Sequence, residues 1–220
     1  MTSVRPGLDR THPIVGGDAG LLDGRVAAPS QNPWRLKMAH ISLPEGVPGI
    51  VGPMIAYPET QVHLSGLAEA LLRGPSSLTS AERELIASYV SSGNQCFFCT
   101  QSHAAAARVH YGAECRVVDQ VLADPDSAPV SAKMKALLVI ADKVRRDGRL
   151  VQAADVDRAR AEGADDKAIH DTVLIAAAFC MFNRYVDGLG TWAPEDPAAY
   201  EESGLRLANQ GYVNYDFGKG

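Results

Sequence analysis

Residues 79–112 read TSAERELIASYVSSGNQCFFCTQSHAAAARVHYG, and this stretch predicts two helices joined by a tight turn. Thr79, followed three residues later by Glu82, is the capping-box pattern that begins a helix. The dipeptide Gly93–Asn94 is typical of a helix end. A second helix is then expected to begin near Cys96 and to run to Tyr111. We therefore expect a helix–turn–helix at the centre of the chain.

Helical patterns continue on both sides of this stretch. Between Glu59 and Arg73, leucines and alanines recur with the i, i+3, i+4 spacing of an amphipathic helix. The longest apolar run, Val173–Phe182, is too short to span a bilayer and fits a buried core helix. No segment shows the sustained alternation of a β-strand. Further helices are expected at Pro48–Ala56, Glu114–Ala123, Ser131–Arg146, Gln152–Ala161, Asp165–Gly188 and Pro197–Asn209.

These patterns indicate an all-α fold of roughly seven or eight helices around the buried 173–182 segment. A chain of 220 residues is long enough for one domain with a real core. Residues 1–33 are rich in Gly, Pro, Asp and Arg without apolar periodicity, so we expect an extended N-terminal arm. Residues 34–210 form the expected helical domain, and residues 211–220 a Gly- and Tyr-rich C-terminal tail.

Charge and composition exclude several classes of partner. The net charge is −5, and the Lys and Arg residues are scattered, which argues against nucleic acid and against a membrane surface. The first residues, MTSVRPGLDRTHP, lack the apolar segment of a secretory signal, so we expect a cytoplasmic protein. In the cytoplasm a CxxC is more often catalytic or metal-binding than a structural disulfide.

Four residues of the central stretch share a chemistry: Glu84, Cys96, Cys99 and His103. Cys99 and His103 are four apart on one helical face, where the imidazole can take the thiol proton. The start of a helix favours an anion, which would lower the pKa of a thiol there. Folding at the turn returns Glu84 toward the second helix, where a buried carboxylate could orient His103 directly or through a water.

The expected reaction is attack of a thiolate on the O–O bond of a hydroperoxide. This leaves a sulfenic acid, which condenses with the neighbouring cysteine to a redox-active disulfide. An external dithiol then reduces the disulfide by exchange. The prediction includes no cofactor and no metal ion.

The pattern Glu84-x11-Cys96-Phe97-Phe98-Cys99-x3-His103 resembles the E…CxxCxxxH signature of AhpD-like alkylhydroperoxidases, in the carboxymuconolactone decarboxylase superfamily. More narrowly, the chain is similar to the uncharacterised peroxidase-related branch, over roughly residues 40 to 192. The supporting segments are Ile41–Gly49 (ISLPEGVPG), Leu71–Ala87 (LLRGPSSLTSAERELIA) and Phe182–Thr191 (FNRYVDGLGT).

The resemblance implies an all-helical, AhpD-like fold, peroxidase chemistry and a symmetric homo-oligomer, a trimer or a multiple of it. It implies that Cys99 meets the peroxide, and that Cys96 resolves the sulfenic acid and exchanges with the reductant. Glu84 and His103 would form the proton relay. The best-studied peroxidases carry a further histidine where this chain has Phe98, so we expect one proton carrier fewer.

Besides the possibility that Cys96 and Cys99 are ordinary buried core cysteines, since buried free Cys is common, three alternatives stay open. Cys96, Cys99, His103 and Cys115 make a Cys₃His zinc set on paper, although their spacings match none of the familiar zinc-finger spacings. A decarboxylase-like enzyme of the same fold is a second alternative, but such relatives need no cysteine pair. A non-enzymatic redox sensor, whose CxxC toggles assembly, is the third.

Other chemically notable residues have structural interpretations. We expect Cys115 and Cys180 to be core thiols, and Asn183, Arg184 and Asp187 to include an Arg–Asp pair near a helix end. Helix-end and packing roles are expected for His110 and His170, and core or pocket-wall positions for Tyr89 and Phe97.

Overall fold

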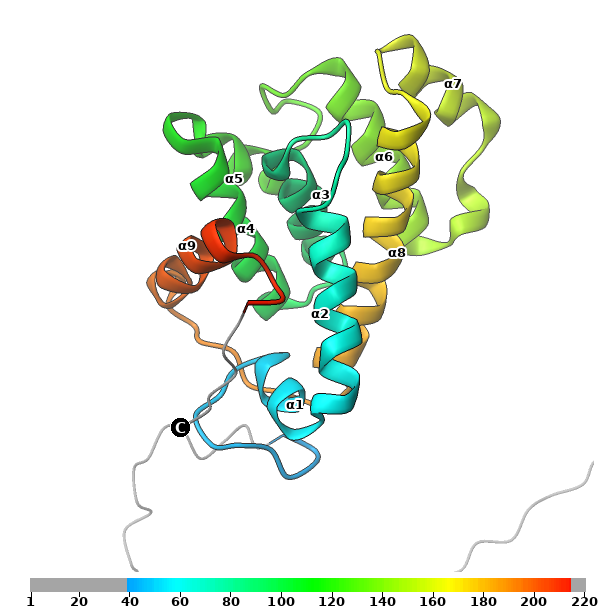
Figure 1. The fold of residues 1–220 in the computed structure, drawn as a ribbon. Coiled ribbons are helices and arrows are strands. Elements are labelled where there is room, and N and C mark those ends of the chain that lie inside the picture. Colours follow the sequence, from blue (N-terminus) through cyan, green and yellow to red (C-terminus); the bar gives the residue numbers. More distant parts are fainter. Residues whose placement is uncertain (1–38, 215–220) are drawn as a thin grey trace, which may run out of the picture. The chain divides into compact units, whose positions relative to one another are not determined.

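The structure, a computed structural model, describes residues 39–214. The arm expected at residues 1–33 lies outside the described residues, as does the end of the expected tail from residue 215. Residues 39–214 contain α-helices and short 3₁₀ turns but no strand (Figure 1), which confirms the all-α prediction. No helix in this part of the chain is long and apolar enough to cross a membrane.

Nine α-helices occur in the described residues, close to where the sequence predicts them. Their bounds are α1 Val51–Ala56, α2 Pro58–Leu72, α3 Ser80–Gly93, α4 Phe97–Tyr111, α5 Arg116–Ala123, α6 Ala132–Arg146, α7 Ala153–Ala161, α8 Asp166–Gly188 and α9 Glu201–Gln210. The 3₁₀ turns are Gly112–Glu114, Gly148–Leu150 and Pro197–Tyr200.

The expected capping box is present at the start of α3. Thr79 Oγ1 accepts from the Glu82 backbone N–H at 3.2 Å, and the Glu82 carboxylate accepts from the Thr79 N–H at 2.8 Å. The helix ends at Gly93, and Gln95 takes a left-handed φ of 63° before α4 begins. This turn reverses the chain, so that α3 and α4 pack against each other.

Helix α3 lies at the centre of the core, packed against α4, α6 and α8 (Figure 1). Leu85, Ile86 and Val90 are fully buried there. Helix α8 buries one face through residues such as Phe179, but Met181 on its other face stays 43% exposed. Helix α9, from the far end of the sequence, packs on α4.

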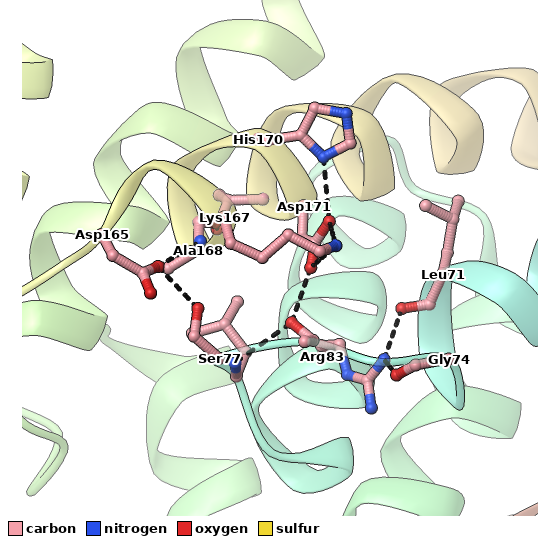
Figure 2. Close-up of polar contacts among 12 residues, drawn as sticks. Leu71, Gly74, Ser77, Arg83, Asp165, Lys167, Ala168, His170 and Asp171 are labelled. Atoms are coloured by element: carbon pink, nitrogen blue, oxygen red, sulfur yellow. Dashed lines mark hydrogen bonds and ion pairs between the residues drawn. The ribbon is translucent and has the colours of Figure 1, made fainter.

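A polar cluster ties the α2–α3 loop to the start of α8 (Figure 2). The Asp171 carboxylate is buried and accepts from Ser76 Oγ at 2.6 Å, from Lys167 Nζ at 2.5 Å and from His170 Nδ1 at 2.9 Å. Beside it, Ser77 Oγ donates to Asp165 Oδ1 at 2.6 Å. His170 therefore has a polar contact rather than the packing role that we expected.

The buried guanidinium of Arg83 closes the other side of the same loop. Its Nη1 donates to the carbonyl oxygens of Leu71 at 3.0 Å and Gly74 at 2.8 Å, at the end of α2 (Figure 2). These bonds satisfy carbonyls that a helix end leaves without intrahelical partners. They also hold the end of α2, and with it Arg73, against α3.

We predict that Asp171→Asn lowers the free energy of unfolding at pH 7 by about 1–3 kcal/mol. Burial alone would raise the pKa of Asp171, but hydrogen bonds from Lys167, Ser76 and His170 hold it below its usual range. The stabilisation is therefore complete above the pKa of an unfolded Asp, and it is lost as the pH falls through the lower, folded value.

Denaturant titrations at several pH values measure this effect. The deficit of Asp171→Asn should be full at pH 7 and should shrink in acid. Asp157→Asn is the control, because the Asp157 side chain is 73% exposed and should change stability little at any pH. Equal deficits for Asp171→Asn at neutral and strongly acidic pH would contradict the assignment.

Candidate functional site

The centre of the site is the side chain of Glu84 on α3, which is fully buried. Its Oε2 lies 2.7 Å from His103 Nδ1 on α4. Its Oε1 accepts from Arg73 Nη2 and from the Tyr212 hydroxyl, both at 2.6 Å. The hairpin of α3 and α4 thus brings Glu84 and His103 into direct contact, and two further donors arrive from elsewhere in the chain.

These donors decide the charge of Glu84. Burial by itself would raise the pKa of this carboxyl, but the charge and hydrogen bond of His103, the Arg73 guanidinium and the Tyr212 hydroxyl bring it below its usual value. An ionised carboxylate can only accept hydrogen bonds, so His103 donates through Nδ1–H. Its Nε2 is then the atom that can exchange a proton when the ring is neutral.

The His103 ring is held by aromatic neighbours on two sides. It stands edge-on to Phe179, with ring centroids 4.5 Å apart, and nearly parallel to Tyr212, at 6.0 Å. Within residues 39–214 it makes no direct hydrogen bond to either Cys96 or Cys99. The direct transfer of a thiol proton to His103 stays a prediction.

Cys96 and Cys99 lie at the start of α4 as free, buried thiols, with Cys96 at the N-cap position. Together with Val186 they form a small apolar cluster, covered by Ile50 and Phe98. The Cys96 sulfur and burial raise the pKa of Cys99 well above its ordinary value. For Cys99 the sequence prediction of a lowered thiol pKa is therefore wrong, because it considered the helix end but neither the hydrogen bond with Cys96 nor the burial of the Cys99 sulfur.

Two side chains of α8 that sequence reasoning did not select contact the thiols. The buried Asn183 amide donates to Ser91 Oγ at 3.0 Å, and its hydrogen bond to Cys99 partly opposes the rise in the pKa of that thiol. The carboxyl of Asp187 faces Cys96; burial raises the pKa of Asp187, and the Cys96 hydrogen bond opposes this.

The expected Arg184–Asp187 ion pair is wrong for the described structure, because Arg184 Nη1 donates to the Cys180 carbonyl at 2.9 Å instead. The sequence did contain one indication that Asn183 and Asp187 contact a common site. The two residues are four apart, so their side chains lie on one face of a helix.

A cavity of about 290 Å³ lies beside the relay. His103, Tyr212, Tyr200 and Arg206 contribute polar groups to it, and most of the other lining residues are apolar. The apolar wall includes Val47, Pro48, Ile50, Met54, Phe98 and Leu207. An apolar cavity with a few polar groups is the usual form of a small-molecule site.

Ile50 and Phe98 stand between this cavity and the two sulfurs, since both line the cavity and both pack on the cysteines. Phe98 is the position where the better-known peroxidases have a histidine. Here its ring packs against the main chain at Gly49, so closely that a Cβ at Gly49 would lie 2.2 Å from the ring. Phe98 therefore supplies an apolar wall instead of a proton carrier.

The remaining candidates lie outside this centre. Cys115 and Cys180 are partly buried, and Cys180 accepts from Asn94 at 3.5 Å. Phe97 is 45% exposed, with its edge against Tyr200. Burial lowers the pKa of His110. Among residues 39–214, no three His, Cys, Asp or Glu side chains form a group that could hold a metal ion. Tyr89 packs against the main core.

Comparisons with known proteins agree with this architecture. Residues 58–143 match the model of the carboxymuconolactone decarboxylase family, a stretch that contains Glu84, both cysteines and His103. No curated protein matches the chain.

Two solved structures are similar to the chain. One is an uncharacterized peroxidase-related protein from Silicibacter sp. TM1040, with a TM-score of 0.63 and 28% identity, covering 70% of this chain and 79% of that one. The other is an alkylhydroperoxidase AhpD core, an uncharacterized peroxidase-related protein from Ralstonia eutropha JMP134. It has a TM-score of 0.64 and 28% identity, and the match covers 72% of this chain and 81% of that one.

We predict that Gly49→Ala displaces the Phe98 ring and destabilises the protein. The φ of Gly49 is 54°, and the added methyl would overlap the ring. Gly46→Ala is the matched control, because Gly46 also has a positive φ, of 75°, but open space around its Cβ position. Denaturant unfolding should show Gly49→Ala to be less stable than Gly46→Ala by at least about 1 kcal/mol. Equal losses would mean that the Phe98 contact contributes nothing beyond backbone strain.

Proposed function

We propose, from the match to the carboxymuconolactone decarboxylase family model, the similarity to AhpD-like structures and the geometry of the site, that the chain is an AhpD-like thiol-dependent peroxidase for organic hydroperoxides. One observation carries the proposal: the buried Glu84 carboxylate holds His103 on the wall of an apolar cavity that adjoins two reduced cysteines. The apolar lining favours a hydroperoxide with an organic substituent over hydrogen peroxide.

In the first step the Cys99 thiolate attacks the distal oxygen of ROOH. An S–O bond forms, the O–O bond breaks, and RO⁻ takes up a proton to leave as the alcohol ROH. Cys99 is oxidised to the sulfenic acid as the peroxide is reduced. The Cys96 sulfur then attacks the Cys99 sulfur, which forms the disulfide and releases water. An external dithiol reduces the disulfide by two exchange steps and is itself oxidised to a disulfide.

The role of His103 in this cycle follows from its position. It lines the cavity, where the leaving alkoxide would form, and its Nδ1 is committed to Glu84. We therefore assign it as the general acid that protonates the alkoxide through Nε2, with Glu84 stabilising the charged imidazole before the transfer. The proton that leaves the Cys99 thiol is balanced by the proton that appears on the alcohol.

The choice of Cys99 as the attacking residue rests on the family resemblance, supported by the Asn183 hydrogen bond, which favours a thiolate on that sulfur. Because the two thiols influence each other, the first proton lost belongs to the pair. Two adjacent reduced cysteines are needed for a disulfide cycle but not for lactone decarboxylation, which favours the redox assignment. A symmetric homo-oligomer and a cytoplasmic location stay predictions.

We predict that Cys99→Ser abolishes peroxide consumption, because no sulfenic acid can form at that position. Without reductant, Cys96→Ser should consume about one equivalent of peroxide and stop at the sulfenic acid, whereas the wild type should stop at the disulfide, since only the wild type has a resolving cysteine. Glu84→Gln and His103→Gln should lower turnover by about 10²-fold or more. The assay follows loss of an alkyl hydroperoxide with a dithiol reductant, and mass spectrometry identifies the oxidised cysteine.

Cys115→Ser and Cys180→Ser are the controls, since neither residue belongs to the dithiol cluster, and both variants should keep their activity. Full activity in Cys99→Ser would refute the assignment of that residue. Absence of peroxide consumption by the wild type with every dithiol tested would refute the peroxidase proposal.

The raised pKa of Cys99 predicts a pH dependence. Below its pKa, the thiolate fraction of a cysteine grows about tenfold for each unit of pH. Single-turnover oxidation of the reduced enzyme should therefore accelerate as the pH rises from about 6 to 8, while the thiol is still mostly protonated. Stopped-flow measurement of the first turnover tests this, and a rate that is flat over that range would contradict the raised pKa.

A further inference from the structure

The segment that follows α9 turns into the site at Gly211. This residue has a φ of 72° and a ψ of −154°, a conformation that is essentially restricted to glycine. The next N–H, that of Tyr212, donates to Glu69 Oε2 on α2 at 2.6 Å. A Cβ at Gly211 would lie 2.3 Å from the same oxygen. The backbone conformation therefore favours glycine at position 211, and an added Cβ would also require the Glu69 carboxylate, which accepts the Tyr212 N–H, to shift.

The turn at Gly211 places the Tyr212 side chain beside Glu84 and His103. Its ring lies near the Arg73 guanidinium, at 5.3 Å from the ring centroid, and nearly parallel to His103. Its hydroxyl donates to Glu84 Oε1 at 2.6 Å and lies 3.3 Å from His103 Nδ1. Burial and the Glu84 charge raise the pKa of Tyr212 well above its ordinary value, so the hydroxyl keeps its proton and acts as a donor.

The hydrogen bond from the Tyr212 hydroxyl helps to orient the Glu84 carboxylate. Arg73 and Tyr212 both donate to Oε1 of Glu84, which leaves Oε2 to the imidazole of His103. Two donors on one oxygen set the orientation of the carboxylate plane. Removing one would leave a buried anion with fewer hydrogen bonds, and such an anion takes up a proton more easily. A protonated Glu84 could no longer stabilise a charged imidazole.

We propose that Tyr212 is a positioning residue of the peroxidase relay, whose hydroxyl aligns the Glu84 carboxylate with His103 and which the Gly211–Glu69 contact puts in place. The proposal rests on the peroxidase function proposed above. It assigns a role to the C-terminal segment beyond α9. It also supplies a third hydrogen-bonding side chain to a relay that lacks the histidine replaced by Phe98.

The first test is Tyr212→Phe, which keeps the ring and removes only the hydroxyl. The titration of Glu84, followed by NMR of ¹³C-carboxyl-labelled glutamate and assigned with Glu84→Gln, should move to higher pH. Turnover of the alkyl hydroperoxide should fall about tenfold at neutral pH, and the acid limb of the rate profile should move in the same direction as the titration. Tyr89→Phe is the control, since Tyr89 lies on the same helix as Glu84 but outside the relay, and it should change neither.

The second test is Gly211→Ala, which should displace Tyr212 without altering it and should reproduce both shifts. Gly163→Ala is its control, because Gly163 has a similar positive φ, of 90°, with open space at its Cβ position. It tests the effect of a methyl group at a positive-φ glycine outside the relay.

The two readouts separate the two proposals. An unchanged Glu84 titration in folded Tyr212→Phe would overturn the role of Tyr212, whatever the enzyme turns over. A shifted titration in a protein without peroxide turnover would support the alignment of Glu84 by Tyr212 and would overturn the peroxidase function. Activity loss in Tyr212→Phe with no shift of the acid limb would indicate a merely structural role and would also overturn the proposal.

Discussion

An ionised carboxylate buried in the central helix is the constraint on which the site depends. Taking such a charge out of water costs several kcal/mol unless donors surround it. Glu84 receives them from three parts of the chain: Arg73 just after α2, His103 on α4, and Tyr212 beyond α9. Each donor has to be held by its own contacts, so the burial of one charge fixes the relative placement of four segments.

The supports of these donors explain several features that are remote from the chemistry. Arg83 bonds to the carbonyls at the end of α2, and Asp171 holds the following loop on α8 (Figure 2). Arg73 lies between these two contacts in the sequence, so both restrict its position. Arg73 also donates to the Leu207 carbonyl on α9 at 3.0 Å, which ties the last helix to the same carboxylate. The hydrogen bonds around Glu84 thus connect separate segments of the fold as well as orienting His103.

Unlike Glu84, which is surrounded by hydrogen-bond donors, Cys96 and Cys99 pack mainly against apolar side chains. The two sulfurs lie in an apolar cluster, where the hydrogen bond with Cys96 and burial raise the pKa of Cys99 in spite of the helix start. In the proposed peroxidase cycle, reactivity would come from outside the thiol pair, through the Asn183 hydrogen bond and a proton supplied by His103 to the leaving group. Ile50 and Phe98 both line the cavity and pack on the sulfurs, so under the proposed function these two side chains would have to move for a peroxide to reach Cys99.

Much of this protein follows from local sequence alone. The capping box at Thr79 and the turn after Gly93 depend only on neighbouring residues, and they dictate the hairpin of α3 and α4. Because that hairpin is short, the contact of Glu84 with His103 could be anticipated from spacing. The periodicity of apolar residues likewise placed the other helices within a few residues of their observed bounds.

Other parts of the site were decided by tertiary structure. Tyr212 lies 128 residues from Glu84 and follows a Gly-rich turn that reads as a tail, so no local pattern connects the two. The contacts of Asn183 and Asp187 with the thiols depend on how α8 crosses α4, which periodicity does not encode. The raised pKa of Cys99 depends on the nearby Cys96 thiol and also on burial, to which side chains from distant segments such as Ile50 and Val186 contribute. Local patterns thus determined the helices and the dithiol–carboxylate–imidazole set, whereas long-range packing decided which groups surround each charge and so how each one ionises.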